Sequence, residues 1–219
     1  MPMVKVIVVG SGGREHTIAW KLAQSSSIDE VICVPGNGGT ATEKKCRNIS
    51  LSQGSYVEIA KKEGCSFAVI GPEDPLAEGL ADSFWEAGIP CVGPKSKGAQ
   101  LEASKDLAKE FMAKYNVACP ASKTFENETD AHNYIDQHGA PIVIKADGLA
   151  AGKGVVVAAT LSEAHKAVTE LMADGRVGEA GKKLVIEDYL EGVEISILAA
   201  VSVTEEFTAN GKSTIIPFL

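Results

Sequence analysis

Two lysines lie within a glycine-rich segment at 142–157, IVIKADGLAAGKGVVV, and this combination is suited to holding a polyanion. The β-branched residues at its two ends predict the paired strands of a hairpin. Small residues fill the turn between them, so that successive N–H groups can approach phosphate oxygens. These small residues are Gly148, Ala150, Ala151, Gly152 and Gly154. Lys145 and Lys153 add positive charge, and we therefore predict a phosphate-binding hairpin.

Two other interpretations compete with a phosphate-binding hairpin at this segment. A flexible hairpin with solvated lysines is the ordinary alternative for a glycine-rich loop taken alone. A Walker P-loop requires the pattern GxxxxGK[ST] followed by a helix. The segment GLAAGKG is one residue too short, places Gly154 where Ser or Thr should hold magnesium, and leads into a strand. The pattern therefore excludes a Walker P-loop.

A second group of anion-binding loops is predicted in the first hundred residues. Residues 4–9 are continuously apolar, which is typical of a parallel strand buried on both faces. The turn Gly10-Ser11-Gly12-Gly13 then leads into a helix over 14–24, where N–H groups can face an anion. The dinucleotide fingerprint GxGxxG is not met, because Glu15 stands in place of the third glycine, so a smaller phosphate is favoured over NAD. Arg14 and His16 lie beside this turn.

The same arrangement of strand, glycine loop and helix repeats along this region. Further strands are predicted at 31–34, 67–70 and 90–92, with helices at 56–63 and 77–87. The strands end in the loops PGNGG (35–39), GPEDP (71–75) and Gly93-Pro94. This alternation predicts a doubly wound parallel sheet, which places the loops along one edge. Rigid turns would explain any one loop, whereas several loops on one edge favour a binding crevice.

The remaining chain predicts a mixed region. Lys95–Gly98 resembles a linker, and 101–117 predicts one helix with Lys105 and Lys109 a turn apart. Further helices are expected at 127–138, with His132 and His138 on its surface, and after Ser162 as a cap. Further strands are expected at 123–125, 184–187, 194–203 and 214–219, with a turn at Asn210-Gly211.

Composition limits the class of protein. With 219 residues, 45% of them hydrophobic, the chain is long enough for one or two cores. A net charge of −8 argues against nucleic acid as the main partner. No apolar run approaches the roughly 18 residues of a membrane span, and no signal peptide is evident, so a cytoplasmic protein is expected. The five cysteines form no CxxC pair and are expected to be reduced core residues, without a zinc site.

The end of the chain carries a separate expectation. Residues 214–219 form an apolar strand with nothing after it, and an exposed apolar edge is unusual for a complete domain. We therefore expect further chain beyond Leu219 in the natural protein.

Six separated segments together resemble the phosphoribosylamine–glycine ligases, a family of the ATP-grasp superfamily. The segments are GSGGREHTIAWKL (10–22), PGNGGT (35–40), GPEDPLAEGLAD (71–82), GPKSKGAQLEASKDLAKEFM (93–112), IVIKADGLAAGKGVVVA (142–158) and VIEDYLEGVEISILA (185–199). The resemblance covers nearly the whole chain in order and spacing. It implies ATP-dependent ligation of glycine to 5-phosphoribosylamine in purine synthesis, through glycyl phosphate, with Mg²⁺ at the phosphates.

The resemblance also implies roles for individual residues. Lys105 and Lys145 would bind ATP phosphates, under a lid formed by the loop from Gly148 through Gly152 and Lys153 to Gly154. Glu187, Tyr189 and Leu190 would line the adenine pocket, and Glu194 would accept hydrogen bonds from the ribose. The residues expected to face phosphoribosylamine are Gly12, Gly13, Asn37, Gly71, Pro72 and Glu73.

The expected fold is α/β: a doubly wound parallel-sheet (pre-ATP-grasp) domain followed by an incomplete ATP-grasp domain of α+β type. The expected segments are an amino-terminal substrate-binding domain (1–98), a linker helix (99–122), a lid subdomain (123–192) and the start of a central sheet (193–219). The family's magnesium ligands and glycine-binding arginine are expected beyond residue 219. We therefore expect a nucleotide cradle that cannot complete the reaction, and fusion to further purine enzymes is left open.

Two alternatives to this function remain open. Another ATP-grasp ligase or a biotin-dependent carboxylase would share the glycine hairpin, although GSGGREH and GPEDPL favour the glycine ligases. A non-catalytic fragment that binds nucleotide, or that only pairs with partners through its terminal strand, belongs to a different class. A nicotinamide oxidoreductase is disfavoured by the missing third glycine.

Overall fold

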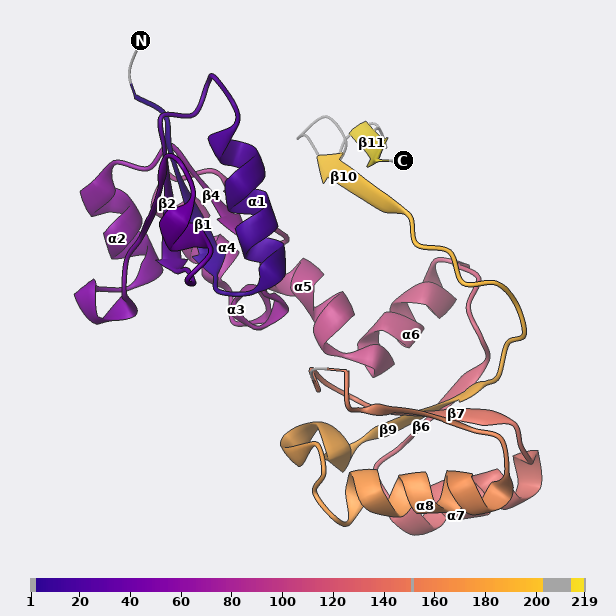
Figure 1. Cartoon of the computed structure of the whole chain (residues 1–219). Coiled ribbons are helices and arrows are strands. Elements are labelled where there is room, and N and C mark those ends of the chain that lie inside the picture. Colours follow the sequence, from indigo (N-terminus) through magenta and orange to yellow (C-terminus); the bar gives the residue numbers. More distant parts are fainter. Residues whose placement is uncertain (1–2, 151, 203–213, 219) are drawn as a thin grey trace. The chain divides into compact units, whose positions relative to one another are not determined.

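The structure, a computed structural model, describes residues 3–150, 152–202 and 214–218. It divides into two compact units, Met1–Tyr189 and Leu190–Leu219, and each unit is treated by itself. Figure 1 shows the order of the elements along the chain. Among the described residues, no helix is long and apolar enough to cross a membrane.

A five-stranded parallel sheet forms the first part of the first unit. Its strands are β1 (Lys5–Gly10), β2 (Glu30–Pro35), β3 (Cys46–Asn48), β4 (Phe67–Ile70) and β5 (Cys91–Val92). They lie in the order β3-β2-β1-β4-β5, with every neighbouring pair parallel. This order confirms the doubly wound sheet. The chain adds β2 and β3 on one side of β1 and then β4 and β5 on its other side, so the strand order reverses between β1 and β4. The short strand β3 was not predicted.

Helices cover both faces of this sheet because β1 is apolar on both. Val6 and Val8 pack with Ala19 of α1 on one face, whereas Ile7 and Val9 share a core with Phe84 of α4 on the other. The helices of this region are α1 (Gly13–Ala23), α2 (Tyr56–Glu63), α3 (Glu73–Ala77) and α4 (Leu80–Glu86). Single-turn helices also occur at η1 (Thr40–Thr42) and η2 (Leu51–Gln53).

Two predicted helices are each broken in the structure. The helix expected at 77–87 is interrupted between α3 and α4, where Gly79 has φ +91°, a left-handed conformation that glycine adopts at little cost. The run at 101–117 is divided at Ser104 into α5 (Ser96–Ala103) and α6 (Lys105–Lys114). The linker expected at Lys95–Gly98 is also wrong, because Ser96 already begins α5.

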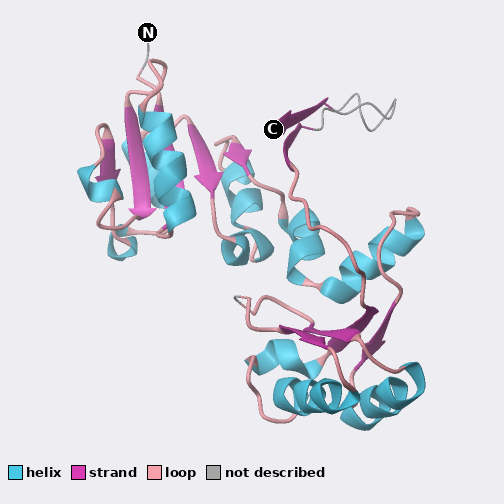
Figure 2. Cartoon of the chain, turned by 45° about the vertical axis from the view of Figure 1, so that its right-hand side comes forward, coloured by secondary structure: helices cyan, strands magenta, loops and turns pink. Residues whose placement is uncertain are grey.

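An antiparallel sheet forms the second part of the first unit. Its strands are β6 (Ser122–Phe125), β7 (Ile142–Ala146), β8 (Val155–Ala158) and β9 (Leu184–Asp188), in the order β6-β9-β7-β8. The pairing of β7 with β8 confirms the predicted hairpin. Two helices, α7 (Glu128–His138) and α8 (Leu161–Met172), cover one face of the sheet (Figure 2), and η3 (Gly178–Lys182) precedes β9.

The alternation along β7 decides which side chains face these helices. Ile142, Ile144 and Ala146 are buried in the core with α7 and α8, whereas Val143 and Lys145 alternate with them and are only partly buried. Side chains alternate between the faces of a strand, so Lys145 lies on the face opposite α7 and α8.

Two details of α7 and α8 differ from expectation. The cap of α8 is Thr160, whose hydroxyl accepts from the N–H of Glu163, and not Ser162. His132 is half-buried and not a surface residue, because its Nδ1 lies 2.7 Å from Nδ1 of His165 on α8. His138 is exposed, as predicted.

The cysteines are free thiols. Cys33 and Cys65 are buried, and burial raises the pKa of Cys33 to about 12, so this thiol stays protonated and unreactive near neutral pH. Cys119 is exposed, which differs from the expectation that the cysteines lie in the core.

The second unit contains an antiparallel pair of strands, β10 (Leu198–Ser202) and β11 (Thr214–Phe218). The strand predicted at 194–203 therefore begins four residues later than expected. The predicted turn at Asn210-Gly211 lies outside the described residues.

Candidate functional site

Three glycine-containing loops follow β1, β2 and β4 at the carboxyl edge of the parallel sheet. The first two are tied together, because the Asn37 side chain donates to the carbonyl oxygens of Ser11 (2.9 Å) and Gly12 (3.3 Å). The N–H of Gly36 also donates to the Gly10 carbonyl at 3.1 Å. The loops predicted from sequence to share an edge are thus in direct contact.

A buried carboxylate occupies part of this edge. Glu15 is 4% exposed, and its Oε2 accepts from the N–H of Gly12 at 2.7 Å, at the start of α1. A Cβ on Gly71 would collide with the same carboxylate, which explains why glycine is needed there. The predicted anion site at this turn is therefore partly filled by the protein's own negative charge. Gly13, in contrast, faces open space.

Arg14 links the first loop to the third. Its guanidinium donates to Glu15 at 2.8 Å and to Glu73 at 3.2 Å. The hydrogen bond to Glu15, followed by that to Glu73, raises the pKa of Arg14. The pKa of Glu73 is lowered by its backbone hydrogen bond and by Arg14. Both side chains are therefore charged at neutral pH.

A cavity of about 300 Å³ lies beside this ion pair. It is next to the carboxyl ends of β1 and β4, between which the strand order reverses. Ligands of open α/β sheets bind at such points. Its lining residues are Arg14, Gly71, Glu73, Leu76, Pro94, Ala99 and Glu102. Pro72 caps α3 at the same loop. The structure thus brings together the predicted residues Gly71, Pro72 and Glu73, with Arg14 as an additional charged group.

A second candidate site is built around the start of α6 and the end of β7. The Lys105 ammonium donates to the Gly148 carbonyl at 2.9 Å, and the Lys105 backbone N–H donates to Asp147 Oδ1 at 2.6 Å. Asp147 is two residues beyond Lys145. Residues 105 and 145, which are 40 positions apart in sequence, therefore belong to one junction.

Glu187 lies on the same sheet face as Lys145. Its carboxylate is 5% exposed and lies 2.7 Å from Lys145 Nζ and 3.4 Å from Lys109 Nζ. Lys109 also donates to the Pro120 carbonyl at 2.9 Å. A buried carboxylate needs such partners, since an unpaired buried charge is costly. The sequence gives Lys109 no role, and the structure makes it a partner of the predicted site residue Glu187.

The glycines of the loop between β7 and β8 are required for two different reasons, backbone conformation and lack of space. Gly148 (φ +128°) and Gly152 (φ +77°) adopt backbone conformations that other residues rarely take. A Cβ on Gly154 would come within 2.8 Å of the Ala150 Cβ, so this position needs glycine for space. Lys153 is exposed, and Ala151 lies outside the described residues.

The remaining predicted nucleotide residues follow β9. Tyr189 is 43% exposed and ends the first unit, whereas Leu190 and Glu194 are exposed residues of the second unit. Their roles in binding adenine and ribose stay predictions.

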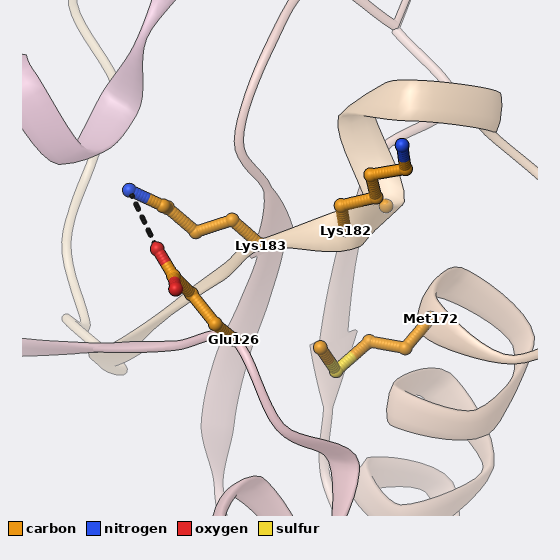
Figure 3. A pocket seen from close by; sticks show the side chains of 5 residues that line it. Glu126, Met172, Lys182 and Lys183 are labelled. Carbon is orange, nitrogen blue, oxygen red and sulfur yellow. Dashed lines mark ion pairs between the residues drawn. The ribbon is translucent and has the colours of Figure 1, made fainter.

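A different cavity, of about 480 Å³, contains two lysines but is not an obvious anion site (Figure 3). Lys183 points to Glu126, 3.2 Å away, and also pairs with Asp106 at 2.9 Å. Hydrogen bonding to Asp106 and then Glu126 raises the pKa of Lys183 above its usual range. Its positive charge is therefore already compensated by two carboxylates.

No cluster of three or more His, Cys, Asp and Glu side chains suited to a metal ion occurs within residues 3–150, 152–202 and 214–218.

The sequence does not identify Asp147 as part of the candidate site. Its contacts with α6 span more than 40 residues, and the only local signal was an acidic residue between Lys145 and Gly148.

Comparison with known proteins identifies relatives along almost the whole chain. The domain described as "Phosphoribosylglycinamide synthetase, N domain" matches residues 4–102, and "Phosphoribosylglycinamide synthetase, ATP-grasp (A) domain" matches residues 103–210. A phosphoribosylamine–glycine ligase from Neisseria meningitidis serogroup B is 53% identical over 90% of this chain and 47% of its own length. The chain therefore spans about half the length of this relative.

Solved structures show the same fold. The crystal structure of phosphoribosylamine–glycine ligase from Thermotoga maritima superposes with a TM-score of 0.70 and 29% identity, covering 97% of this chain and 49% of that one. The biotin carboxylase domain of Hydrogenobacter thermophilus 2-oxoglutarate carboxylase gives a TM-score of 0.66 at 18% identity, over 87% of this chain and 45% of that one. The second match shows a shared fold and nothing more specific.

Proposed function

Because the chain belongs to the phosphoribosylamine–glycine ligase family, we propose that it takes part in the ATP-dependent ligation of glycine to 5-phosphoribosylamine. In this proposal a glycine carboxylate oxygen attacks the γ-phosphorus of ATP, forming glycyl phosphate and releasing ADP. The amine of the sugar phosphate then attacks the acyl carbon, and inorganic phosphate leaves. Mg²⁺ would offset negative charge on the nucleotide. The cytoplasmic location expected from the sequence is part of the same proposal.

The observation that carries the proposal is the junction of Lys105, Gly148 and the end of β7. A lysine ammonium at a glycine-rich loop is well suited to phosphate oxygens, because the small residues leave the backbone accessible. Lys145 adds a second ammonium on the sheet face opposite α7 and α8, where it pairs with Glu187. For this chain, we therefore propose binding of the nucleotide as its part in the reaction.

The loops of the parallel sheet support a second binding role. We propose that the Arg14 cavity and the open face at Gly13 receive phosphoribosylamine, with Asn37 holding two of the loops together. Arg14 is paired with both Glu15 and Glu73, so it would bind a sugar phosphate by exchanging the half-exposed Glu73 carboxylate for the phosphate while it keeps its contact with the buried Glu15.

Calorimetric titration with ADP tests nucleotide binding by the chain. Lys145→Ala should weaken ADP binding about 10-fold or more, because one charge-assisted contact is removed. Adenosine affinity should change little. Lys166→Ala, at a lysine whose side chain is 76% exposed on α8, is the matched control.

Absence of ADP binding by the unmodified chain would refute the nucleotide role and favour an interaction fragment. Equal loss of ADP affinity in the Lys166 control would show that general charge, and not the cradle, attracts the nucleotide.

A further inference from the structure

Asp147 makes an unusual set of contacts for a residue in a glycine-rich hairpin. Its Oδ1 accepts from the backbone N–H groups of Lys105 (2.6 Å) and Asp106 (3.1 Å). The Ser104 hydroxyl donates to both carboxylate oxygens, at 3.2 and 3.3 Å. One side chain from the end of β7 therefore binds the first turn of α6 through three donor groups.

The backbone of Asp147 is fixed as well. Its N–H donates to the Lys183 carbonyl at 2.8 Å, just before β9 begins. The next residue, Gly148, accepts from the Lys105 ammonium at 2.9 Å. The carboxylate is therefore held by the sheet on one side and holds Lys105 on the other.

We propose that Asp147 is a positioning residue that sets Lys105 relative to Lys145, so that both ammonium groups reach the phosphates of one nucleotide. This inference rests on the proposed nucleotide binding. A lysine side chain is long and flexible, so the location of its backbone determines which phosphate oxygens it can reach. Errors of about 1 Å in such placement weaken binding and catalysis substantially.

The chemistry of a helix start explains why an acceptor is needed here. The first N–H groups of α6 have no partner within the helix and attract anions. Asp147 satisfies two of them, which directs an incoming phosphate to the lysine side chains. Its negative charge also opposes phosphate binding, so an uncharged acceptor should serve at least as well.

Calorimetry on the full 219-residue chain separates position from charge, with ADP and adenosine as the ligands. Asp147→Ala should weaken ADP binding about 10-fold or more and leave adenosine affinity unchanged. Asp147→Asn, which keeps an acceptor oxygen, should bind ADP at least as tightly as the unmodified chain. Asp174→Ala, at an exposed aspartate, is the matched control.

A double variant tests whether Asp147 acts through Lys105. The combination of Asp147→Ala with Lys105→Ala should bind ADP no more weakly than Lys105→Ala alone, because both remove the same contact. Additive losses would overturn the inference. Unchanged ADP affinity in Asp147→Ala would also overturn it, as would an equal loss of adenosine affinity, which indicates a general structural role.

If circular dichroism shows that Asp147→Ala does not fold, Asp147→Glu takes its place. This variant keeps the charge but displaces the carboxylate by one methylene. Full ADP affinity in Asp147→Glu would contradict the inference. If the unmodified chain binds adenosine but gains nothing from the phosphates of ADP, the proposed phosphate cradle itself is wrong and this inference is overturned with it.

Discussion

Glu187 shows how a single carboxylate can serve two lysines. It pairs with Lys145 at 2.7 Å and with Lys109 at 3.4 Å while only 5% exposed. If Lys145 turns to a phosphate, as proposed, Glu187 still has Lys109 as its partner. When Lys145 moves from Glu187 to the phosphate, the buried Glu187 carboxylate is therefore not left uncompensated, which would typically cost several kcal/mol.

Asp106 links α6 to the antiparallel sheet and gives stability a defined pH dependence. Hydrogen bonds from Thr124 (2.6 Å) and from Lys183 (2.9 Å) lower the pKa of Asp106 below its ordinary value of 3.8. The folded state therefore takes up this proton at a lower pH than the unfolded state. The stabilisation is complete above about pH 5, declines as the pH approaches the unfolded pKa and is lost as the pH falls through the folded pKa.

Asp106→Asn should lower the melting temperature at pH 6, and the difference from the unmodified chain should shrink as the pH is lowered from 5 to 3. Solvent screening limits the effect to about 1 kcal/mol. Thermal melts at several pH values measure it, with Asp174→Asn as the control. A difference that grows towards low pH would contradict the assignment.

At the scale of elements, the start of α8 offers a direct comparison of two neighbouring residues. The Thr160 hydroxyl accepts from the Glu163 N–H, and the Glu163 carboxylate accepts from the N–H groups of Thr160 and Ala159. Thr160→Ala should cost about 1 kcal/mol of unfolding free energy. Ser162→Ala, two residues later and without this capping role, should cost much less.

Urea denaturation measures both variants. Comparable losses in the two would show that the capping interaction is not what fixes the beginning of α8.

Elements with a strong local pattern could be predicted from the sequence. The hairpin of β7 and β8 follows from β-branched runs around a glycine loop, and the parallel sheet follows from apolar strands that end in glycine loops. The break at Ser104 could not be predicted in this way, because the apolar spacing continues through it. At the break, Ser104 caps α6 by accepting from the Leu107 N–H, and its hydroxyl also donates to Asp147, which reaches it only in the folded chain.

The candidate site shows the same division. Lys105 and Lys145 could be proposed from motifs, whereas their connection through Asp147 and the pairing of Glu187 with Lys109 required the fold. The burial of Glu15 among the glycine loops was likewise invisible in the sequence, where it appeared only as a departure from a dinucleotide motif.

At the scale of the whole molecule, the second unit carries an exposed apolar segment. Val193, Ile195 and Ile197 are 91%, 80% and 78% exposed. Exposed apolar segments promote association, so the chain should self-associate as its concentration rises. Changing both Ile195 and Ile197 to Lys should reduce this association and alter the unfolding free energy by no more than about 0.5 kcal/mol.

Sedimentation velocity at increasing protein concentration measures the effect. The control changes Gln53 and Gln137, two exposed residues of the first unit, to Lys, so that it adds the same charge elsewhere. Equal reduction of association by the control would show that net charge alone is responsible.

The order of strands also bears on how the chain folds during its synthesis. The parallel sheet is built entirely from residues 5–92, so all of its strands are available early, and amino-terminal domains generally fold first on the ribosome. In the antiparallel sheet, β9 lies between β6 and β7, which do not pair with each other. Translation must therefore reach residue 188 before β6 can join β7 and β8. Until then the β7–β8 hairpin, which carries the glycine loop, lacks its neighbouring strand, and this interval is when the nascent chain most needs protection from aggregation.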